Sequence, residues 1–305
     1  LTPAPPLHVN TPAYRGRFAP SPSGPLHFGS LVAAVASFAD ARHHRGTWLV
    51  RIEDVDQTRS QPGIEAHILA TLSAFGMQSD EVPERQSGRT ERYETVLDEL
   101  VNMGPAYRCN CSRATVAAIA RMGPEGPIYP GTCRRRPPDP KRPAAWRVKT
   151  SDRPIDFVDR ILGETTQNLA KDIGDFVVKR IDGYTAYQLA VVIDDFDQGI
   201  TDVVRGADLF WSTPRQIWLQ QLLGFPQPRY AHLPLVYTPD GCKLSKADQA
   251  HPVDDQNPLS GLIDAWSHLG QRPPDSRISD CSEFWEWAIP QWDLSLVPRE
   301  RNIRS

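Results

Sequence analysis

The 305-residue chain lacks any apolar run close to the roughly 20 residues of a membrane-spanning helix, and it lacks an excess of either charge. Its 34 lysines and arginines and 37 aspartates and glutamates give a formal net charge of −3, unlike many nucleic-acid-binding proteins. This balance still allows a ligand that contacts one charged face. The first residues are rich in proline and carry no apolar export signal. We therefore expect a flexible tail over 1–13 and a cytoplasmic protein with no membrane partner.

Cysteine is also scarce, and the odd total of five argues against a disulfide framework in a cytoplasmic protein. Three cysteines, Cys109, Cys111 and Cys133, fall within one Gly- and Pro-rich segment, where their thiolates can surround one Zn²⁺ ion. Because this segment contains no histidine, the phenol of Tyr129 or a water molecule must supply the fourth ligand. We expect one structural zinc ion, bound at partial occupancy. Three reduced cysteines without metal are the alternative.

The most informative stretch lies near the start, where a short apolar run at 16–19 is followed by a loop of prolines, serines and Gly24. Residues with helical spacing then begin near Gly29, so the pattern predicts a strand, a tight loop and a helix. The first N–H groups of such a helix form a site for phosphate. His27 lies at the junction, where its imidazole can donate a hydrogen bond to a phosphate oxygen. An ordinary α/β connection has a similar pattern, so this stretch alone does not establish a function.

A second polar stretch near the other end, at 241–247, contains two lysines and a serine. Together the two stretches resemble the His-Ile-Gly-His and Lys-Met-Ser-Lys-Ser motifs of the class I aminoacyl-tRNA synthetases. Here they read His27-Phe28-Gly29-Ser30 and Lys243-Leu244-Ser245-Lys246-Ala247, and the last position of each departs from the family pattern. The stretches at 51–56, 187–195 and 199–206 are similar to the glutamyl branch of that family. The resemblance covers about residues 14–248.

The resemblance implies an ATP-dependent ligase, with ATP and Mg²⁺ as cofactors and His27, Lys243 and Lys246 as catalytic residues. The implied ATP-binding residues are Pro20, Gly24, His27, Gly29, Ser30 and Lys246. It further implies that L-glutamate is bound by Arg17, Ser21, Glu53, Tyr187 and Arg205. These residue types suit the substrate, because guanidinium groups form paired hydrogen bonds with carboxylates and Glu53 can complement the ammonium group. Which arginine holds which carboxylate stays open.

The expected fold is α/β, a Rossmann-like, doubly wound parallel sheet of the class I synthetase type. Its two halves are placed at 14–105 and 182–240. An inserted zinc-binding, α+β subdomain is placed at 106–181, where short antiparallel strands are expected. The range 241–305 is expected to hold the lysine loop and a C-terminal helical segment. Within the sheet, apolar runs predict strands over 47–52, 185–193, 200–208 and 232–237, with a hairpin turn at Asp182-Gly183.

The residues after 248 contain only short helical patches, so we expect no anticodon-binding domain. That feature and the Cys-x-Cys…Tyr-x-x-x-Cys pattern closely resemble the glutamyl-queuosine tRNA(Asp) synthetase family. Its members activate glutamate without tRNA and transfer it to the queuosine base at the wobble position of tRNA(Asp). The resemblance, and not the residue chemistry, supplies this acceptor. A truncated glutamyl-tRNA synthetase and a non-catalytic tRNA-binding paralogue are the alternatives. We expect a monomer that contacts tRNA through basic residues over 134–149.

Overall fold

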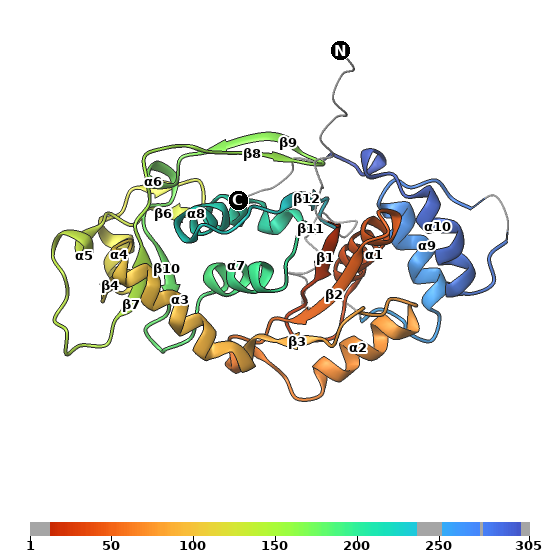
Figure 1. The fold of residues 1–305 in the computed structure, drawn as a ribbon, viewed down its shortest axis with the longest axis horizontal. Helices are drawn as coiled ribbons and strands as arrows, with labels where there is room; N and C mark the ends of the chain where they lie inside the picture. Colours follow the sequence, from red (N-terminus) through yellow and green to blue (C-terminus); the bar gives the residue numbers. More distant parts are fainter. Residues whose placement is uncertain (1–12, 237–251, 275–276, 300–305) are drawn as a thin grey trace, which may run out of the picture.

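The structure, a computed structural model, describes residues 13–236, 252–274 and 277–299 (Figure 1). The strands are β1 (Arg15–Phe18), β2 (Thr47–Ile52), β3 (Glu84–Arg85), β4 (Ala106–Cys109), β5 (Met122–Gly123), β6 (Gly126–Pro127), β7 (Ala145–Val148), β8 (Ile155–Asp159), β9 (Gly163–Gln167), β10 (Phe176–Lys179), β11 (Asp202–Gly206) and β12 (Arg229–Leu233). The helices are α1 (Phe28–His43), α2 (Ile64–Ala74), α3 (Thr90–Asn102), α4 (Arg113–Ile119), α5 (Thr132–Arg135), α6 (Leu169–Asp172), α7 (Tyr187–Asp197), α8 (Thr213–Leu223), α9 (Pro258–His268) and α10 (Cys281–Gln291).

The main sheet has the strand order β3-β2-β1-β11-β12-β8-β9, and its neighbouring strands are parallel except for β8 and β9. The chain moves from β1 to β2 in one direction and from β11 to β12 in the other. The order therefore reverses between β1 and β11, and in a doubly wound sheet ligands bind in the crevice at that point. The predicted α/β class with a mostly parallel sheet is confirmed.

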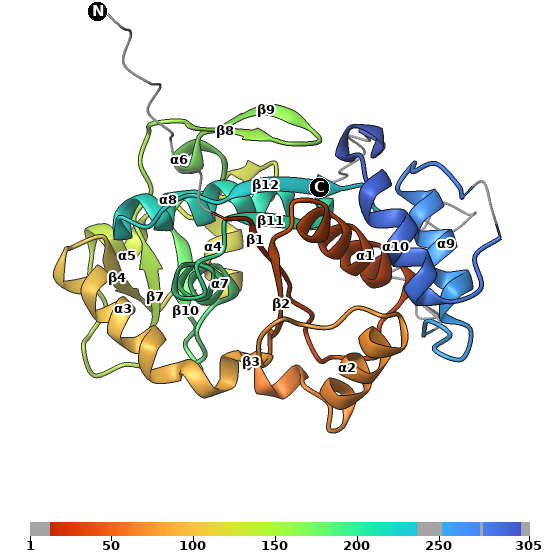
Figure 2. The same ribbon diagram turned by 45° about the vertical axis from the view of Figure 1, so that its right-hand side comes forward.

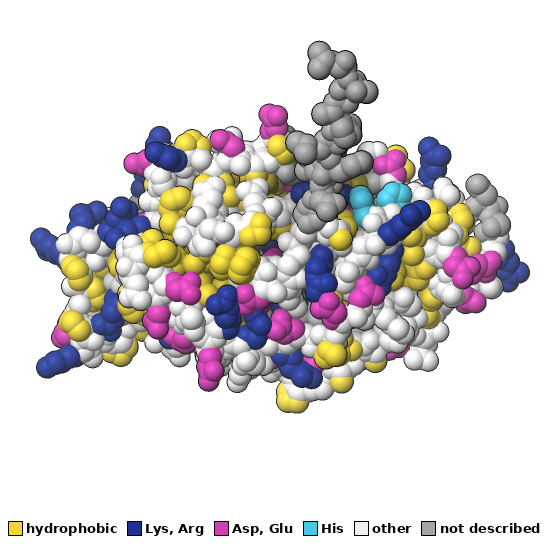
Figure 3. Space-filling view, in the orientation of Figure 1, with side chains coloured by type: hydrophobic (Ala, Val, Ile, Leu, Met, Phe, Trp, Pro, Cys, Tyr) yellow, Lys and Arg dark blue, Asp and Glu magenta, His cyan; other side chains and the backbone are white. Residues whose placement is uncertain are grey.

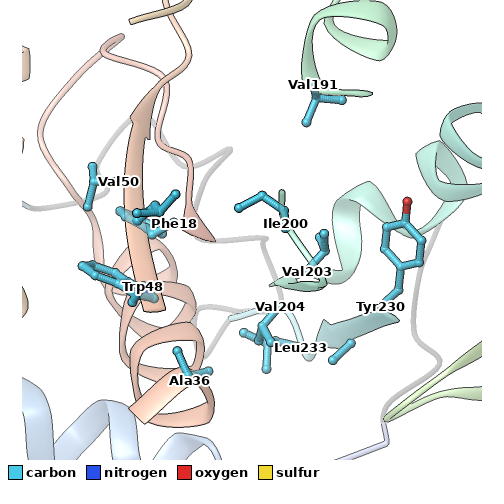
Figure 4. Packing of buried hydrophobic residues seen from close by; sticks show 14 of the residues in the cluster. Phe18, Ala36, Trp48, Val50, Val191, Ile200, Val203, Val204, Tyr230 and Leu233 are labelled. Atoms are coloured by element: carbon cyan, nitrogen blue, oxygen red, sulfur yellow. The ribbon is translucent and has the colours of Figure 1, made fainter. Parts of the chain in front are cut away.

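Helices cover both faces of this sheet, as Figures 1 and 2 show. Helix α1 lies on one face beside α9 and α10, and α7 and α8 lie on the other. The core between these layers is rich in aliphatic and aromatic side chains, among them Phe18, Trp48 and Val50 beside Ala36 of α1 (Figure 4). Val191 comes to the same core from α7. This burial fixes the strand ends that carry the polar site.

The strand predicted over 185–193 is wrong, because these residues begin helix α7. Every residue from 189 to 195 is buried, so the apolar run has no alternation that would distinguish a strand from a buried helix. The turn at Asp182-Gly183 does form, with Gly183 at φ 95°. The segments on the two sides of this turn are joined by an isolated bridge, between Lys179 and Thr185, and helix α7 begins two residues later.

Short strands do form in the range predicted as an insertion, but they belong to three different sheets, one of which is the two-stranded sheet of β5 and β6. β4, β7 and β10 make a small antiparallel sheet, whereas β8 pairs with β12 and extends the large sheet. Alternating burial along β8 indicates a strand with one buried face and does not identify its partner. The division of the chain into domains stays a prediction.

The C-terminal helices confirm the helical patches expected after residue 248. They pack on α1 through aromatic side chains, and Trp285 also donates a hydrogen bond from Nε1 to the carbonyl oxygen of Phe75 (2.9 Å). The tryptophans of this region therefore belong to the core. Among the described residues, no helix has both the length and the apolar character that crossing a membrane requires.

Candidate active site

A cavity of about 540 Å³ opens at the carboxyl ends of β1 and β11, beside the start of α1. Its walls come from the loop after β1, from the segment after β2, from the start of α7 and from the residues that follow β11 and β12. All ten described residues to which ATP or glutamate binding was assigned line it, namely Arg17, Pro20, Ser21, Gly24, His27, Gly29, Ser30, Glu53, Tyr187 and Arg205. The structure thus brings together residues that lie up to 188 positions apart, from 17 to 205.

Arg17 reaches the cavity from β1 and is held by a buried carboxylate. Its Nε and Nη2 donate to the two oxygens of Asp195 at 3.0 and 3.3 Å, and Arg51 Nη2 donates to the same carboxylate at 2.7 Å. Burial alone would raise the pKa of Asp195, but the two guanidinium groups outweigh it and hold that pKa below its ordinary value. Asp195 is therefore ionised and fixes one edge of Arg17.

Arg205 is held differently, by neutral acceptors. Its Nε donates to His232 Nε2 at 3.0 Å, and its Nη2 donates to the hydroxyl of Thr213 at 2.9 Å. Weaker bonds of 3.3 to 3.4 Å reach the carbonyl oxygen of Leu209 and the hydroxyl of Tyr187. Within the described residues, no carboxylate forms an ion pair with Arg205. Its guanidinium therefore lines the cavity without a carboxylate partner among the described residues.

Glu53 follows β2 and brings a buried carboxylate to the site, in contrast to the two guanidinium groups. Its side chain is only 9% exposed, and its Oε1 has no hydrogen-bond partner in the described structure. The closest cation is Arg51, at 3.7 Å. Burial raises the pKa of Glu53 to about 7, although Arg51 and Arg17 oppose the rise. Such a carboxylate gains most from a cation brought by a ligand.

The loop before α1 carries the other half of the site. His27 is the N-cap of α1, and its Nδ1 accepts a hydrogen bond from the N–H of Ser30 at 3.3 Å. Gly29 makes this arrangement fit, because a Cβ atom there would lie 3.1 Å from the His27 ring. Lys243 and Lys246 lie outside the described residues. The described chain stops at Val236, which lines the cavity, and resumes at Pro252, which pairs with His27.

A candidate metal centre lies in the small antiparallel sheet region. The sulfur atoms of Cys109, Cys111 and Cys133 lie within 4.8 Å of one another, and the Tyr129 hydroxyl lies 3.3 Å from Cys109 Sγ and 3.7 Å from Cys111 Sγ. Tetrahedral Zn²⁺ with bonds of about 2.3 Å places its sulfur ligands about 3.8 Å apart. Burial opposes ionisation of Cys109, but hydrogen bonds from Tyr129 and Arg147 lower its pKa overall, whereas burial raises the pKa of Cys111 to about 11. A coordinated metal ion deprotonates such thiols, so the spacing and the residue types decide the fit. The donor set therefore fits a zinc ion.

Comparison with known proteins agrees with this geometry. The family model for "tRNA synthetases class I (E and Q), catalytic domain" matches residues 13–259. The chain is 51% identical over 292 residues to the glutamyl-Q tRNA(Asp) synthetase of Aromatoleum aromaticum, which covers 95% of this chain and 92% of that protein. The protein of the same name from Neisseria meningitidis is 49% identical, with 94% and 98% covered. The chain belongs to the glutamyl-Q tRNA(Asp) synthetase family.

A solved structure gives the same fold. The glutamate tRNA ligase of Elizabethkingia meningosepticum, crystallised with its amino acid, superposes with a TM-score of 0.80 at 27% identity. The match covers 95% of this chain but 66% of that ligase, so this member of the glutamyl-Q tRNA(Asp) synthetase family spans about two thirds of it.

Sequence reasoning missed the residues that support the two arginines. Asp195 and Arg51 lie in the stretches that resemble the glutamyl branch but were assigned no role, and His232 was assigned none either. Asp195 offers a signal that could have been used, since an acidic residue in a continuous apolar run must be paired when it is buried. Asp159 offers none, because its partner His232 lies 73 residues away in the sequence.

The basic residues expected to contact tRNA fall into two groups. Arg134, Arg135 and Arg136 are exposed at one end of the molecule, where lysines and arginines gather in Figure 3. Arg147 is less exposed, and its guanidinium lies 3.9 Å from the centre of the Tyr129 ring and donates to Cys109. It therefore supports the cysteine cluster.

Proposed function

We propose that this protein activates L-glutamate with ATP and Mg²⁺, without tRNA, and transfers it to the queuosine base of tRNA(Asp). The observation that carries the proposal is the charge arrangement of the cavity. One wall holds the buried carboxylate of Glu53, whose Oε1 has no hydrogen-bond partner among the described residues, and two others hold the guanidinium groups of Arg17 and Arg205. Glutamate has one ammonium group and two carboxylates, which match these three charges. Membership of the glutamyl-Q tRNA(Asp) synthetase family supplies the acceptor.

In the first step, a carboxylate oxygen of glutamate attacks the α-phosphorus of ATP, and pyrophosphate leaves. This displacement needs positioning and charge stabilisation more than covalent participation by the protein. We assign the start of α1 to the phosphates, with Pro20, Gly24, Gly29 and Ser30 in its cradle. His27 gives the α-phosphate a hydrogen bond, and Lys243 and Lys246 stabilise the departing pyrophosphate. Ser21 and Tyr187 provide neutral contacts to glutamate.

In the second step, a nucleophilic group of the queuosine base attacks the carbonyl carbon of the adenylate, and AMP leaves. The exposed arginines of α5 and its neighbourhood are proposed to contact tRNA phosphates. A monomer suffices for this reaction.

A zinc ion held by Cys109, Cys111, Tyr129 and Cys133 is proposed as a structural part of the same enzyme. It would tie β4 to α5, the two elements that supply its ligands or flank them. Purified Cys109→Ser is expected to hold much less zinc than the parent protein. Cys281→Ser is the control, because Cys281 lies on α10, outside this cluster. Equal zinc contents in the two variants would contradict the assignment.

Charging of a tRNA 3′ end is a second candidate, favoured by the 0.80 TM-score with a glutamate tRNA ligase. The test offers ATP and labelled glutamate with tRNA(Asp) that contains or lacks queuosine, and with tRNA(Glu). Label on queuosine-containing tRNA(Asp) alone is expected. Label on the 3′ end of tRNA(Glu) would establish the second candidate. An absence of both adenylate and transfer would favour a tRNA-binding paralogue.

A further inference from the structure

Three neighbouring strands place Asp159, His232 and Arg205 in one row. Arg205 on β11 is directly opposite His232 on β12, and β12 pairs in turn with the end of β8, where Asp159 lies. His232 Nδ1 lies 2.6 Å from Asp159 Oδ2, and His232 Nε2 lies 3.0 Å from Arg205 Nε. The side chains of Asp159 and His232 are fully buried. The row therefore runs from the interior to the cavity wall.

The partners of His232 determine where its proton lies. Arg205 Nε can only donate, so Nε2 of His232 must accept, and Nδ1 must carry the hydrogen that Asp159 accepts. Burial and the charge of Arg205 lower the pKa of His232 to about 4, although Asp159 opposes this. The ring is thus neutral near pH 7. Asp159 itself is fixed, because its Oδ1 accepts from the backbone N–H groups of Ile161, Leu162 and His232.

A neutral acceptor has a specific consequence for Arg205. A carboxylate in direct contact with this guanidinium would offset part of the positive charge that Arg205 presents to the cavity. His232 instead fixes the direction of Arg205 through a neutral acceptor, and the carboxylate of Asp159 lies behind the imidazole. The packing of Phe210 against the imidazole, at 5.1 Å between ring centres, restrains the ring.

We propose that His232, oriented by Asp159, is the positioning residue that aims Arg205 at a glutamate carboxylate without neutralising it. This inference rests on the proposed binding of glutamate by Arg205. The inference adds Asp159 of β8 and His232 of β12 to the residues that determine the affinity for glutamate. His232 contacts neither substrate and acts only through Arg205.

Two amide substitutions separate positioning from stability. In His232→Gln the side-chain oxygen can take the place of Nε2 and accept from Arg205, whereas in His232→Asn the amide can take the place of Nδ1 and donate to Asp159. Each variant keeps one of the two hydrogen bonds. We expect the KM for glutamate in ATP–pyrophosphate exchange to rise about tenfold in His232→Asn and less than about threefold in His232→Gln. The KM for ATP is expected to stay within about twofold in both.

An equal rise in both variants, in step with falling Tm values, would indicate a structural role and overturn the inference. A measurement on the unsubstituted protein covers the case in which a variant does not fold. With ¹⁵N-labelled histidine, one ring should stay in the neutral Nδ1–H form at pH 5, where exposed histidines are protonated. The absence of such a ring would overturn the inference. Failure of glutamate-dependent exchange in the unsubstituted protein would instead count against the proposed function.

Discussion

Asp40 and Glu53 are both buried carboxylates, but they lie near opposite ends of the strands of the main sheet and differ in their hydrogen bonding. Asp40, on α1 near the amino ends of the strands, is fully buried and accepts hydrogen bonds from Tyr14, Arg160 and Trp292 at 2.5 to 3.1 Å. Glu53, beyond the carboxyl end of β2, accepts none from the described residues. One carboxylate joins segments of the fold, and the other lines the cavity.

The pKa values of the two carboxylates follow their hydrogen bonding: that of Asp40 is lowered and that of Glu53 is raised. Burial acts to raise both, but at Asp40 the hydrogen bonds and charge of Arg160 outweigh it and lower the pKa. At Glu53 burial prevails and raises the pKa to about 7. Groups whose charge is disfavoured in the folded protein are concentrated at functional sites, which agrees with the proposed role of Glu53 in binding the ammonium group.

The largest expected effect is on stability in Asp40→Asn. Removing the charge leaves Arg160 without its closest partner and should lower the free energy of unfolding by about 3 kcal/mol in urea denaturation. The KM for glutamate should not change. Glu81→Gln is the control, since it breaks an exposed ion pair with Arg15 and should cost less than about 1 kcal/mol. Equal losses of unfolding free energy in Asp40→Asn and Glu81→Gln would show that the buried carboxylate contributes no more to stability than an exposed one.

Glu53→Gln should show the reverse pattern. The variant keeps the shape of the side chain and removes the charge that complements the ammonium group, so kcat/KM for glutamate in ATP–pyrophosphate exchange should fall about 100-fold. Stability should not fall, because the removed charge is buried, its Oε1 accepts no hydrogen bond from the described residues, and its closest cation, Arg51, lies 3.7 Å away. A variant with unchanged exchange kinetics but a lowered Tm would make Glu53 a structural residue like Asp40.

The pH dependence of stability should distinguish the two carboxylates by its sign. The lowered pKa of Asp40 contributes stability above the ordinary carboxyl pKa, which is lost as the pH falls. The raised pKa of Glu53 contributes stability at low pH, which is lost as the pH rises towards and through about 7. Between pH 5 and 8, the parent protein should therefore lose up to about 2 kcal/mol relative to Glu53→Gln. Parallel stability curves for the two proteins would contradict this assignment.

The contrast also explains what could be predicted from the sequence. The loop before α1, the strand over 47–52 and ten of the residues lining the cavity were predicted because each depends on a local pattern or a family motif. Helix α7 was missed because a run that is buried on all sides has no periodicity. Neither the partners of Asp40 nor the row through His232 could be predicted, since they form between strands and helices far apart in the chain.

A pair of hydroxyl deletions should give the smallest effects and the closest test. Tyr14→Phe removes one of the donors to Asp40, so the free energy of unfolding should fall by about 1.5 kcal/mol with no change in the KM for glutamate. Tyr187→Phe removes a hydroxyl that lines the cavity and accepts only a 3.4 Å bond from Arg205. In Tyr187→Phe the free energy of unfolding should change by less than about 0.5 kcal/mol, while the KM for glutamate rises about fivefold. Both substitutions delete the same atom, a tyrosine hydroxyl oxygen, so each is the control for the other. If Tyr14→Phe raised the KM for glutamate and Tyr187→Phe lowered the stability, the hydrogen bonding of a buried polar group would not distinguish structural from functional residues in this fold.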